Sequence, residues 1–233
     1  MKTHTPTNES GLAGVDLSRR SFLRYAGAGA AAVTAVIAIE SCKKNHDVKR
    51  VDVGSGDVGI LNYAYALEQL EAAFYTKVVA SPYLGMSSDE LSLLTDIRDH
   101  EVAHREFFKA ALAGNAIKGL TLDFSSINFS DRGSVLAAAK SFEDLGVSAY
   151  NGAGAMITTP DYLVLAGKIV SVEARHAALI RDLIQFNTFV DASVVDINNT
   201  STEYSKSPKE VIPIANRYLY PESQISFSSI GAY

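Results

Sequence analysis

Hydrophobic residues recur at steps of three and four in four long stretches of the chain. The stretches cover residues 59–81, 88–114, 132–159 and 160–186. Such spacing places the hydrophobic side chains on one stripe of an α-helix. Serines precede the acidic pair Asp89 and Glu90, as at a helix start, and Pro160 suits the first turn of a helix. The pattern therefore predicts four long amphipathic helices.

The connections between these helices are unequal in length. Short turns join the first helix to the second and the third to the fourth, so each pair should form an antiparallel hairpin. About 17 residues, 115–131, separate the second helix from the third. They can span about 56 Å when extended, whereas a helix of about 26 residues is only about 39 Å long. We therefore expect an all-α four-helix bundle with a long crossover, in which helices two and three run parallel.

The residues after 186 are rich in Ser, Thr and Asn, which predicts a short helical and irregular extension. Within it, Ser207, Pro208 and Glu210 provide an N-cap, a first-turn proline and a capping-box glutamate, so a short helix should reach Leu219. We divide this part of the chain into a bundle at 58–188 and a C-terminal extension at 189–233 that packs on the bundle.

The N-terminal residues have the pattern of an export signal. Arg19 and Arg20 stand directly before hydrophobic residues, and an uncharged run rich in Ala and Gly follows from Tyr25 to Ile39. A basic stretch followed by a short apolar run is typical of a secretory signal, and the paired arginines resemble the twin-arginine signal of bacterial export. We predict a signal peptide at 1–41. Residues 42–57 are polar and contain Gly-Ser-Gly, which predicts a flexible tether.

Cys42 stands at the end of the signal and is the one cysteine of the chain. The preceding Ile39-Glu40-Ser41 resembles a lipoprotein cleavage box, after which the cysteine is acylated, although a small residue is usual at the position of Glu40. The alternative is cleavage at a nearby site, which leaves Cys42 as a free thiol or removes it. We expect a periplasmic protein of the bacterial cell envelope, tethered to a membrane if Cys42 is lipidated.

Composition narrows the range of functions. Hydrophobic residues make up 47% of the chain and charged residues 20%, which is ordinary for a globular domain. A net charge of −5 without a basic stripe argues against a nucleic-acid partner. A single cysteine excludes a disulfide framework and any site built on Cys-x-x-Cys pairs. No apolar run reaches the roughly 18 residues of a membrane span.

Each predicted helix carries a glutamate in the middle of its hydrophobic stripe. A glutamate is almost never fully buried unless it is paired, because an unpaired buried carboxylate is strongly destabilising or becomes neutral. Only Arg98 and Arg105 lie near these stripes, so the glutamates should share another positive charge. The four are Glu68, Glu101, Glu143 and Glu173.

Two histidines complete the pattern of a metal site. The second and fourth helices each carry Glu-x-x-His, ending at His104 and His176. Residues three apart share a helix face, so each pair can bind one metal while its glutamate also bridges to a second. Two such helices, with one glutamate from each of the other two, form the ligand set of dinuclear iron and manganese bundles. Carboxylate oxygens with one imidazole per metal suit Fe or Mn.

The two halves of the chain look like copies of one hairpin. Glu68 and Glu143 are 75 positions apart, as are Tyr75 and Tyr150, and the two Glu-x-x-His motifs are 72 apart. A pseudo-twofold axis with the metals between the halves explains this register. Tyr75 and Tyr150 would then lie one to two turns from the metals, where they bond the ligands or carry an electron. Ordinary core aromatics with satisfied hydroxyls are the alternative.

Three stretches of the sequence resemble known ferritin-like proteins. Leu61-Asn62, followed by Glu68 and Tyr75, resembles the first helix of ferritins and bacterioferritins. Residues 169–183 and 207–211 resemble the last helix and the tail of exported ferritin-like proteins that are grouped with plant desiccation-related proteins. The resemblance covers residues 59–219 and implies a ferritin-like fold with a dinuclear site. Its metal ligands would be Glu68, Glu101, His104, Glu143, Glu173 and His176, with Glu71 as a substitute for Glu68.

The second helix also contains a competing motif. His100, Glu101 and His104 match His-Glu-x-x-His, in which two histidines bind zinc and the glutamate is the general base of a peptidase. That interpretation leaves the glutamates of the other three helices unexplained. The dinuclear interpretation leaves over only His100, as a residue on the surface or next to a ligand, and we favour it.

These features predict an exported protein with two Fe or two Mn ions, iron ahead of manganese, that acts on O₂ or H₂O₂. Ferroxidase, peroxidase and catalase-like reactions fit such a site, and a peroxidase would need a separate electron donor. The alternative is a non-catalytic envelope stress protein that uses the bundle as a scaffold, and a zinc peptidase ranks below it. A closed storage cage is disfavoured, because the extension and a lipid tether would both hinder a shell, and a homodimer is compatible with the sequence.

Overall fold

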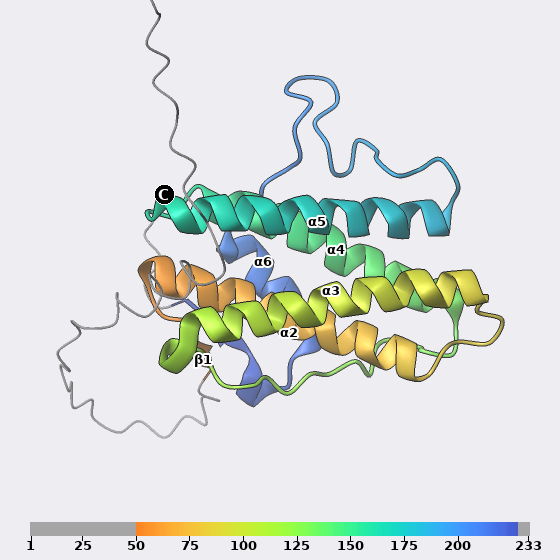
Figure 1. The fold of residues 1–233 in the computed structure, drawn as a ribbon, viewed down its shortest axis with the longest axis horizontal. Coiled ribbons are helices and arrows are strands. Elements are labelled where there is room, and N and C mark those ends of the chain that lie inside the picture. The colour runs from red at the N-terminus through yellow and green to blue at the C-terminus, as the bar shows by residue number, and fades with distance from the viewer. Residues whose placement is uncertain (1–49, 228–233) are drawn as a thin grey trace, which may run out of the picture.

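Four long helices lie side by side in the computed structural model, which describes residues 50–227. They are α2 (Gly56–Ala80), α3 (Ser88–Leu112), α4 (Arg132–Gly154) and α5 (Pro160–Ile184). Figure 1 shows that α2 and α3 form one antiparallel hairpin and that α4 and α5 form the other. The predicted all-α bundle is confirmed, and each helix falls within a few residues of its predicted range.

The connection between α3 and α4 runs back along the bundle, as its length predicts, so that α3 and α4 are parallel (Figure 1). It begins with a single 3-10 turn, η1 (Ala113–Asn115). The C-terminal extension holds its middle, because Leu122 forms an isolated antiparallel bridge with Leu219 and the Asp123 amide donates to the Tyr218 carbonyl at 2.7 Å. The crossover is therefore a packed part of the fold.

The helix ends have local causes in the sequence. The Ser87 side chain accepts a hydrogen bond from the Glu90 amide, and the Asp131 side chain accepts one from the Ser134 amide. Each bond satisfies an amide that the first turn of a helix leaves without a partner. Asp57, near the start of α2, accepts hydrogen bonds from the Thr158 and Thr159 amides and so joins the two hairpins at the turn that precedes α5.

An aromatic cluster fills the bundle near the crossover. Phe74 of α2 is fully buried, and its ring lies 5.0 Å from that of Phe142 of α4 and within 6.0 Å of two rings of the crossover, Phe124 and Phe129. Most of these pairs meet edge to face, the geometry that aromatic rings prefer. The cluster ties α2 to α4 and to the segment that connects the two hairpins.

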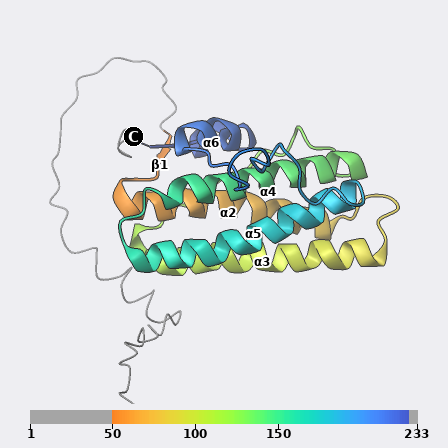
Figure 2. The same ribbon diagram turned by 90° about the horizontal axis from the view of Figure 1, so that it is seen from above.

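The C-terminal extension packs on the outer side of α4, as Figure 2 shows for its helix α6 (Pro208–Ala215). A capping box between Ser207 and Glu210 starts α6, as predicted. The turns η2 (Asn216–Tyr218) and η3 (Pro221–Ser223) follow, and β2 (Ile225–Ser226) then pairs in parallel with β1 (Val51–Asp52).

The tether prediction for 42–57 meets the described residues only at its end. There, Val51–Asp52 forms β1 and α2 already begins at Gly56, so these residues belong to the fold. The Gly-Ser-Gly run leads from β1 into the first residue of α2, and its Gly54 and Gly56 have positive φ. The predicted signal peptide and Cys42 lie outside the described residues.

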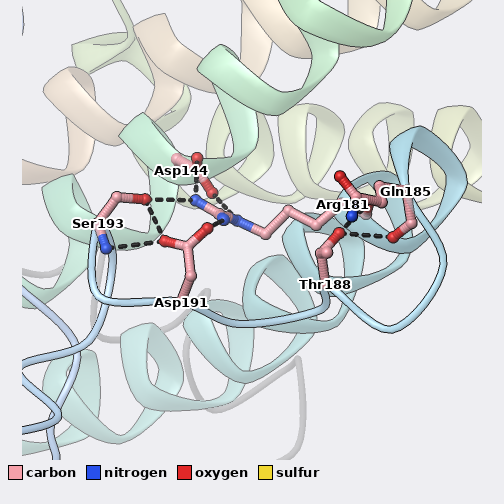
Figure 3. A network of polar contacts seen from close by, with 6 residues as sticks. All are labelled: Asp144, Arg181, Gln185, Thr188, Asp191 and Ser193. Atoms are coloured by element: carbon pink, nitrogen blue, oxygen red, sulfur yellow. Dashed lines mark hydrogen bonds and ion pairs between the residues drawn. The ribbon is translucent and has the colours of Figure 1, made fainter.

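A buried arginine anchors the segment between α5 and α6 (Figure 3). Arg181 of α5 is 3% exposed and donates two hydrogen bonds to Asp144 of α4, at 3.0 and 2.7 Å. It also donates to Asp191 at 2.7 Å and to Ser193 at 3.1 Å. A buried charge is tolerated where it is paired and hydrogen-bonded, so this network fixes residues 187–193 against the second hairpin.

Candidate metal centre

The glutamate at the middle of each long helix is fully buried. Glu68, Glu101, Glu143 and Glu173 all have 0% exposure, and His176 has 4%. Each of the four long helices provides one of these glutamates. On α3 and on α5, the histidine of the Glu-x-x-His pair follows its glutamate by about one turn. The hydrophobic stripes thus turn all four carboxylates into the bundle interior, as the sequence predicts.

These side chains form two overlapping groups that could each bind a metal ion. In each group, one ligand atom per residue lies within 4.8 Å of all the others. Glu101 and Glu173 belong to both groups, which suits them to bridge two ions. Each group adds one further glutamate and one histidine. The first group adds Glu68 and His104, and the second adds Glu143 and His176.

Most of these polar atoms have close neighbours without hydrogen bonds. His104 Nδ1 lies 2.8 Å from a Glu173 oxygen, and His176 Nδ1 lies 2.7 Å from a Glu101 oxygen. Yet both nitrogens, and both oxygens of Glu101 and of Glu173, are buried without a hydrogen-bond partner. Leaving such groups unsatisfied costs about 1–3 kcal/mol each. Carboxylate and imidazole atoms that converge within 4.8 Å of one another fit a bound cation.

Neither arginine near the stripes neutralises the cluster. Arg98 pairs with Asp99 at 2.6 Å, and Arg105 pairs with Glu106 at 2.8 Å. Both acidic partners are at least half exposed, so these pairs lie on the outer face of α3. The positive charge that the buried glutamates require does not come from these residues.

Protons can supply part of that charge, because the pKa values of both histidines and of Glu68 are raised. Burial disfavours charge on His104, but Glu101, Glu173 and Glu68 outweigh it and raise its pKa to about 12. Burial also lowers the pKa of His176, but the nearby Glu101, Glu143 and Glu173 outweigh burial and raise this pKa to about 12. Burial, followed by the charge of Glu173, raises the pKa of Glu68 well above its usual value. These raised pKa values show that the cluster favours bound protons, and the same negative charge would attract metal cations.

Two tyrosines bond the glutamates across the halves of the bundle. Tyr75 of α2 donates to Glu143 Oε1 of α4 at 2.5 Å, and Tyr150 of α4 donates to Glu68 Oε1 of α2. The two bonds are reciprocal, as a pseudo-twofold axis between α2 and α4 requires. Burial, followed by the nearby glutamates, raises the pKa of both hydroxyls well above its usual value, so both stay protonated donors.

Glu71 is a further buried carboxylate, one turn after Glu68 on α2. Burial raises its pKa well above the usual value, and the charges of Glu101 and Glu173 raise it further. It lies outside both groups of converging ligand atoms. Glu71 therefore lies beside the cluster. The sequence analysis named it as a substitute for Glu68, but Glu68 is the residue that belongs to a candidate metal group.

His100 contacts one of the two candidate ligand histidines. Its Nδ1 lies 2.9 Å from His176 Nε2, and the two rings stack at 5.2 Å with an angle of 16°. Among residues 50–227, the groups that could bind metal do not include His100. The His-Glu-x-x-His motif is therefore present in the sequence, but His100 faces α5 instead of sharing a metal position with His104.

The sequence did not predict two features in and near the centre. The contact of His100 with His176 depends on how α3 and α5 are rotated against each other, which one helix pattern does not encode. The anchoring of α5 by Arg181 depends on residues after the bundle folding back. The one available signal was an arginine at the inner edge of the fourth stripe.

Comparisons with known families agree with this geometry. The ferritin-like domain family matches residues 56–186, and the TAT (twin-arginine translocation) pathway signal sequence matches residues 16–36. No curated protein matches the chain. None of the helices within residues 50–227 has the length and apolar character needed to cross a membrane. Since the first match covers more than half of the 233 residues, the chain belongs to the ferritin-like domain family and carries a signal for export by the twin-arginine route.

Proposed function

We propose that this protein binds two Fe or Mn ions at the candidate metal centre and acts on O₂ or H₂O₂ outside the cytoplasm. The observation that carries the proposal is the convergence of buried, unpartnered carboxylate and imidazole atoms from all four helices. Twin-arginine export fits, because a chain that folds before transport can be loaded with its metal inside the cell.

The residues present would supply two similar metal positions. Glu101 and Glu173 would bridge, while each ion would have one histidine and one further glutamate of its own. Hard oxygen donors with a single imidazole favour Fe or Mn over Cu(I) and over a thiolate-type zinc site. A pair of such ions supplies the electrons for reducing O₂ or H₂O₂, and iron is the ion we favour.

The protein's own groups orient the ligands. Tyr75 and Tyr150 restrict the rotation of Glu143 and Glu68 by donating to one oxygen of each, which leaves the other oxygen free for a metal. Groups that hold metal ligands in this way commonly change metal affinity when they are removed. The two tyrosines therefore pre-organise the site from the α2–α4 side.

A small apolar cavity borders the site beside Tyr150. Its volume is about 20 Å³, and its lining includes Phe108, Tyr162 and Ile169. Most of the lining is apolar, and the lining also includes Tyr63, whose buried hydroxyl has no hydrogen-bond partner. A mostly apolar lining disfavours a charged substrate at that end of the centre, because burying an unpaired charge is costly.

The first experiment is elemental analysis of protein purified from its native envelope without chelator. We expect about two Fe or Mn per chain, as the ligand set of this fold predicts. Glu173→Ala should lose the metal and any turnover of peroxide or Fe(II), because Glu173 belongs to both groups. Glu106→Ala is the control, since Glu106 is exposed on the same face as Arg105 and should leave the metal content unchanged.

Other results would replace the proposal. One zinc per chain, dependent on His100, would favour a peptidase. No metal after anaerobic loading with Fe(II) or Mn(II) would leave a ferritin-like scaffold without redox chemistry. Ferroxidase, peroxidase and catalase-like activity are then separated by which substrate the loaded protein consumes, with and without an external electron donor.

A further inference from the structure

Glu71 presents a carboxylate to the centre that the two metal positions do not use. It is 3% exposed, and it lies on the same face of α2 as Glu68 and Tyr75, three residues after the first and four before the second. Its strongest charged neighbours are the glutamates of the centre. A buried carboxylate with such neighbours is protonated unless a positive charge lies close by, so a cation in the centre would allow it to ionise.

The residue opposite Glu71 is a glycine that makes room for it. Gly146 stands 75 positions later on α4, which is the same offset that relates Glu68 to Glu143. A Cβ atom added at Gly146 would lie 3.0 Å from Oε1 of Glu71. The pseudo-twofold axis thus relates a glutamate to a glycine at this point, and the missing side chain leaves space for one carboxylate in place of two.

The charge of the centre indicates what this carboxylate serves. Four ionised glutamates balance two divalent ions when both histidines are neutral. Two trivalent ions would carry two further positive charges, and unbalanced charge in a buried site is costly. A fifth carboxylate reduces that excess, whereas beside two divalent ions it would itself be unbalanced. Charge balance therefore distinguishes the two oxidation states at Glu71.

We propose that Glu71 is an additional metal ligand on the α2–α4 side, which moves toward the ions over Gly146 and binds trivalent ions in preference to divalent ones. This rests on the proposed function, because it requires a metal pair in the centre. Glu71 lies outside both groups of converging atoms and beside them, which is the place for a ligand that the two shared positions do not already use.

The test compares Ga(III), a trivalent ion that does not change valence, with Mn(II). Competition with a chelator of known affinity gives both dissociation constants for the purified full chain. We expect Glu71→Gln to weaken Ga(III) binding roughly 10- to 100-fold, the range typical of groups that act on a metal site. Mn(II) binding should change by less than about threefold, which is within the usual context dependence of such effects.

Glu90→Gln is the matched control. Glu90 is buried to a similar degree on α3, but it pairs with Arg132 at 2.7 Å, away from the centre. It should leave the ratio of the two affinities unchanged. If the wild type binds two ions and Glu71→Gln has the same ratio of Ga(III) to Mn(II) affinity as the wild type, the role of Glu71 is overturned and the proposed function stands. A wild type that binds neither ion would overturn the proposed function and this inference with it.

A double exchange decides the matter even where the single variant folds poorly. Glu71→Gly combined with Gly146→Glu moves the carboxylate to the pseudo-symmetric position on α4. If the carboxylate acts as a ligand, the exchange should restore Ga(III) binding to within about tenfold of the wild type. Loss of the Ga(III) preference in a folded double variant, judged by its helical circular dichroism, would contradict the inference.

Discussion

The two hairpins of the bundle carry equivalent candidate ligands in different surroundings. Each provides one glutamate from its first helix and a Glu-x-x-His pair from its second, and each provides a tyrosine that bonds the other's glutamate. The flanking positions differ, since Glu71 and His100 of the first hairpin correspond by offset to Gly146 and Val172 of the second. The candidate ligands thus form two groups that could each bind an ion, and the differences around them would allow the two proposed positions to behave unequally.

The largest difference between the two positions is expected from removing a glutamate that belongs to only one of them. Glu68→Ala and Glu143→Ala should each lower the metal content from about two ions per chain to about one, because each group keeps the shared Glu101 and Glu173. Elemental analysis after anaerobic loading measures this. Loss of both ions in either variant would show that the positions fill only as a pair.

Arg181 of the second hairpin should contribute more to the stability of the fold than its counterpart in the first hairpin. Arg181→Ala should lower the free energy of unfolding by about 3 kcal/mol, because it leaves the Asp144 carboxylate against α5 without its partner. Its counterpart by offset in the first hairpin is Lys109, which is exposed. Lys109→Ala should change stability by less than about 0.5 kcal/mol. Urea denaturation of both variants checks the difference, and equal effects would refute it.

His100 should make one position bind metal differently from the other. His100→Ala removes the neighbour of His176 Nε2, while His104 is expected to be unaffected. We expect affinity at the position of His176 to fall roughly tenfold, as for other groups that orient a ligand histidine. Stepwise Mn(II) titration followed by electron paramagnetic resonance separates the two positions. Val172→Ala, at the corresponding place, is the control and should leave both affinities unchanged.

The smallest expected effect concerns Asp57, which joins the hairpins. Burial raises its pKa, but hydrogen bonds from Thr158 and Thr159 outweigh burial, so the folded pKa lies below the ordinary value. A depressed carboxyl pKa stabilises the fold above the unfolded pKa, and this contribution is lost as the pH falls through the folded pKa.

Asp57→Asn should therefore cost about 1 kcal/mol at pH 7, a hydrogen-bond contribution reduced for partial exposure to solvent. The difference from the wild type should shrink as the pH falls below about 4, near the ordinary Asp pKa. Thermal unfolding across that range measures it. Asp96→Asn on the exposed face of α3 is the control, and a difference that persists at low pH would contradict the assignment.

Helix ranges and the centre's residues were predictable because they depend on local pattern. The stripes fixed which faces are buried, and Ser87, Pro160 and Ser207 marked helix starts that the structure has. The length of the crossover was enough to predict its direction. The helix patterns and caps depend on residues close together in sequence, and the direction of the crossover depends only on how far an extended segment of its length can span.

Features that depend on distant residues were not predictable. The pairing of Val51–Asp52 with Ile225–Ser226 involves strands of two residues, too short for any alternation to show. The role of Gly146 opposite Glu71 became visible only when α2 and α4 were placed together. A polar stretch such as 42–57 gives no sign of its partner, which is why its end was taken for a tether.

The β1–β2 pair has a consequence for the order in which the protein is made. Translation proceeds from the N-terminus, and β2 emerges 174 residues after β1. Until then β1 has no partner, and the surface of α2 that packs against α6 stays open to water. A growing chain therefore cannot close this end of the bundle while it is being synthesised. Completion of the fold is a late event, which suits an export route that accepts finished proteins.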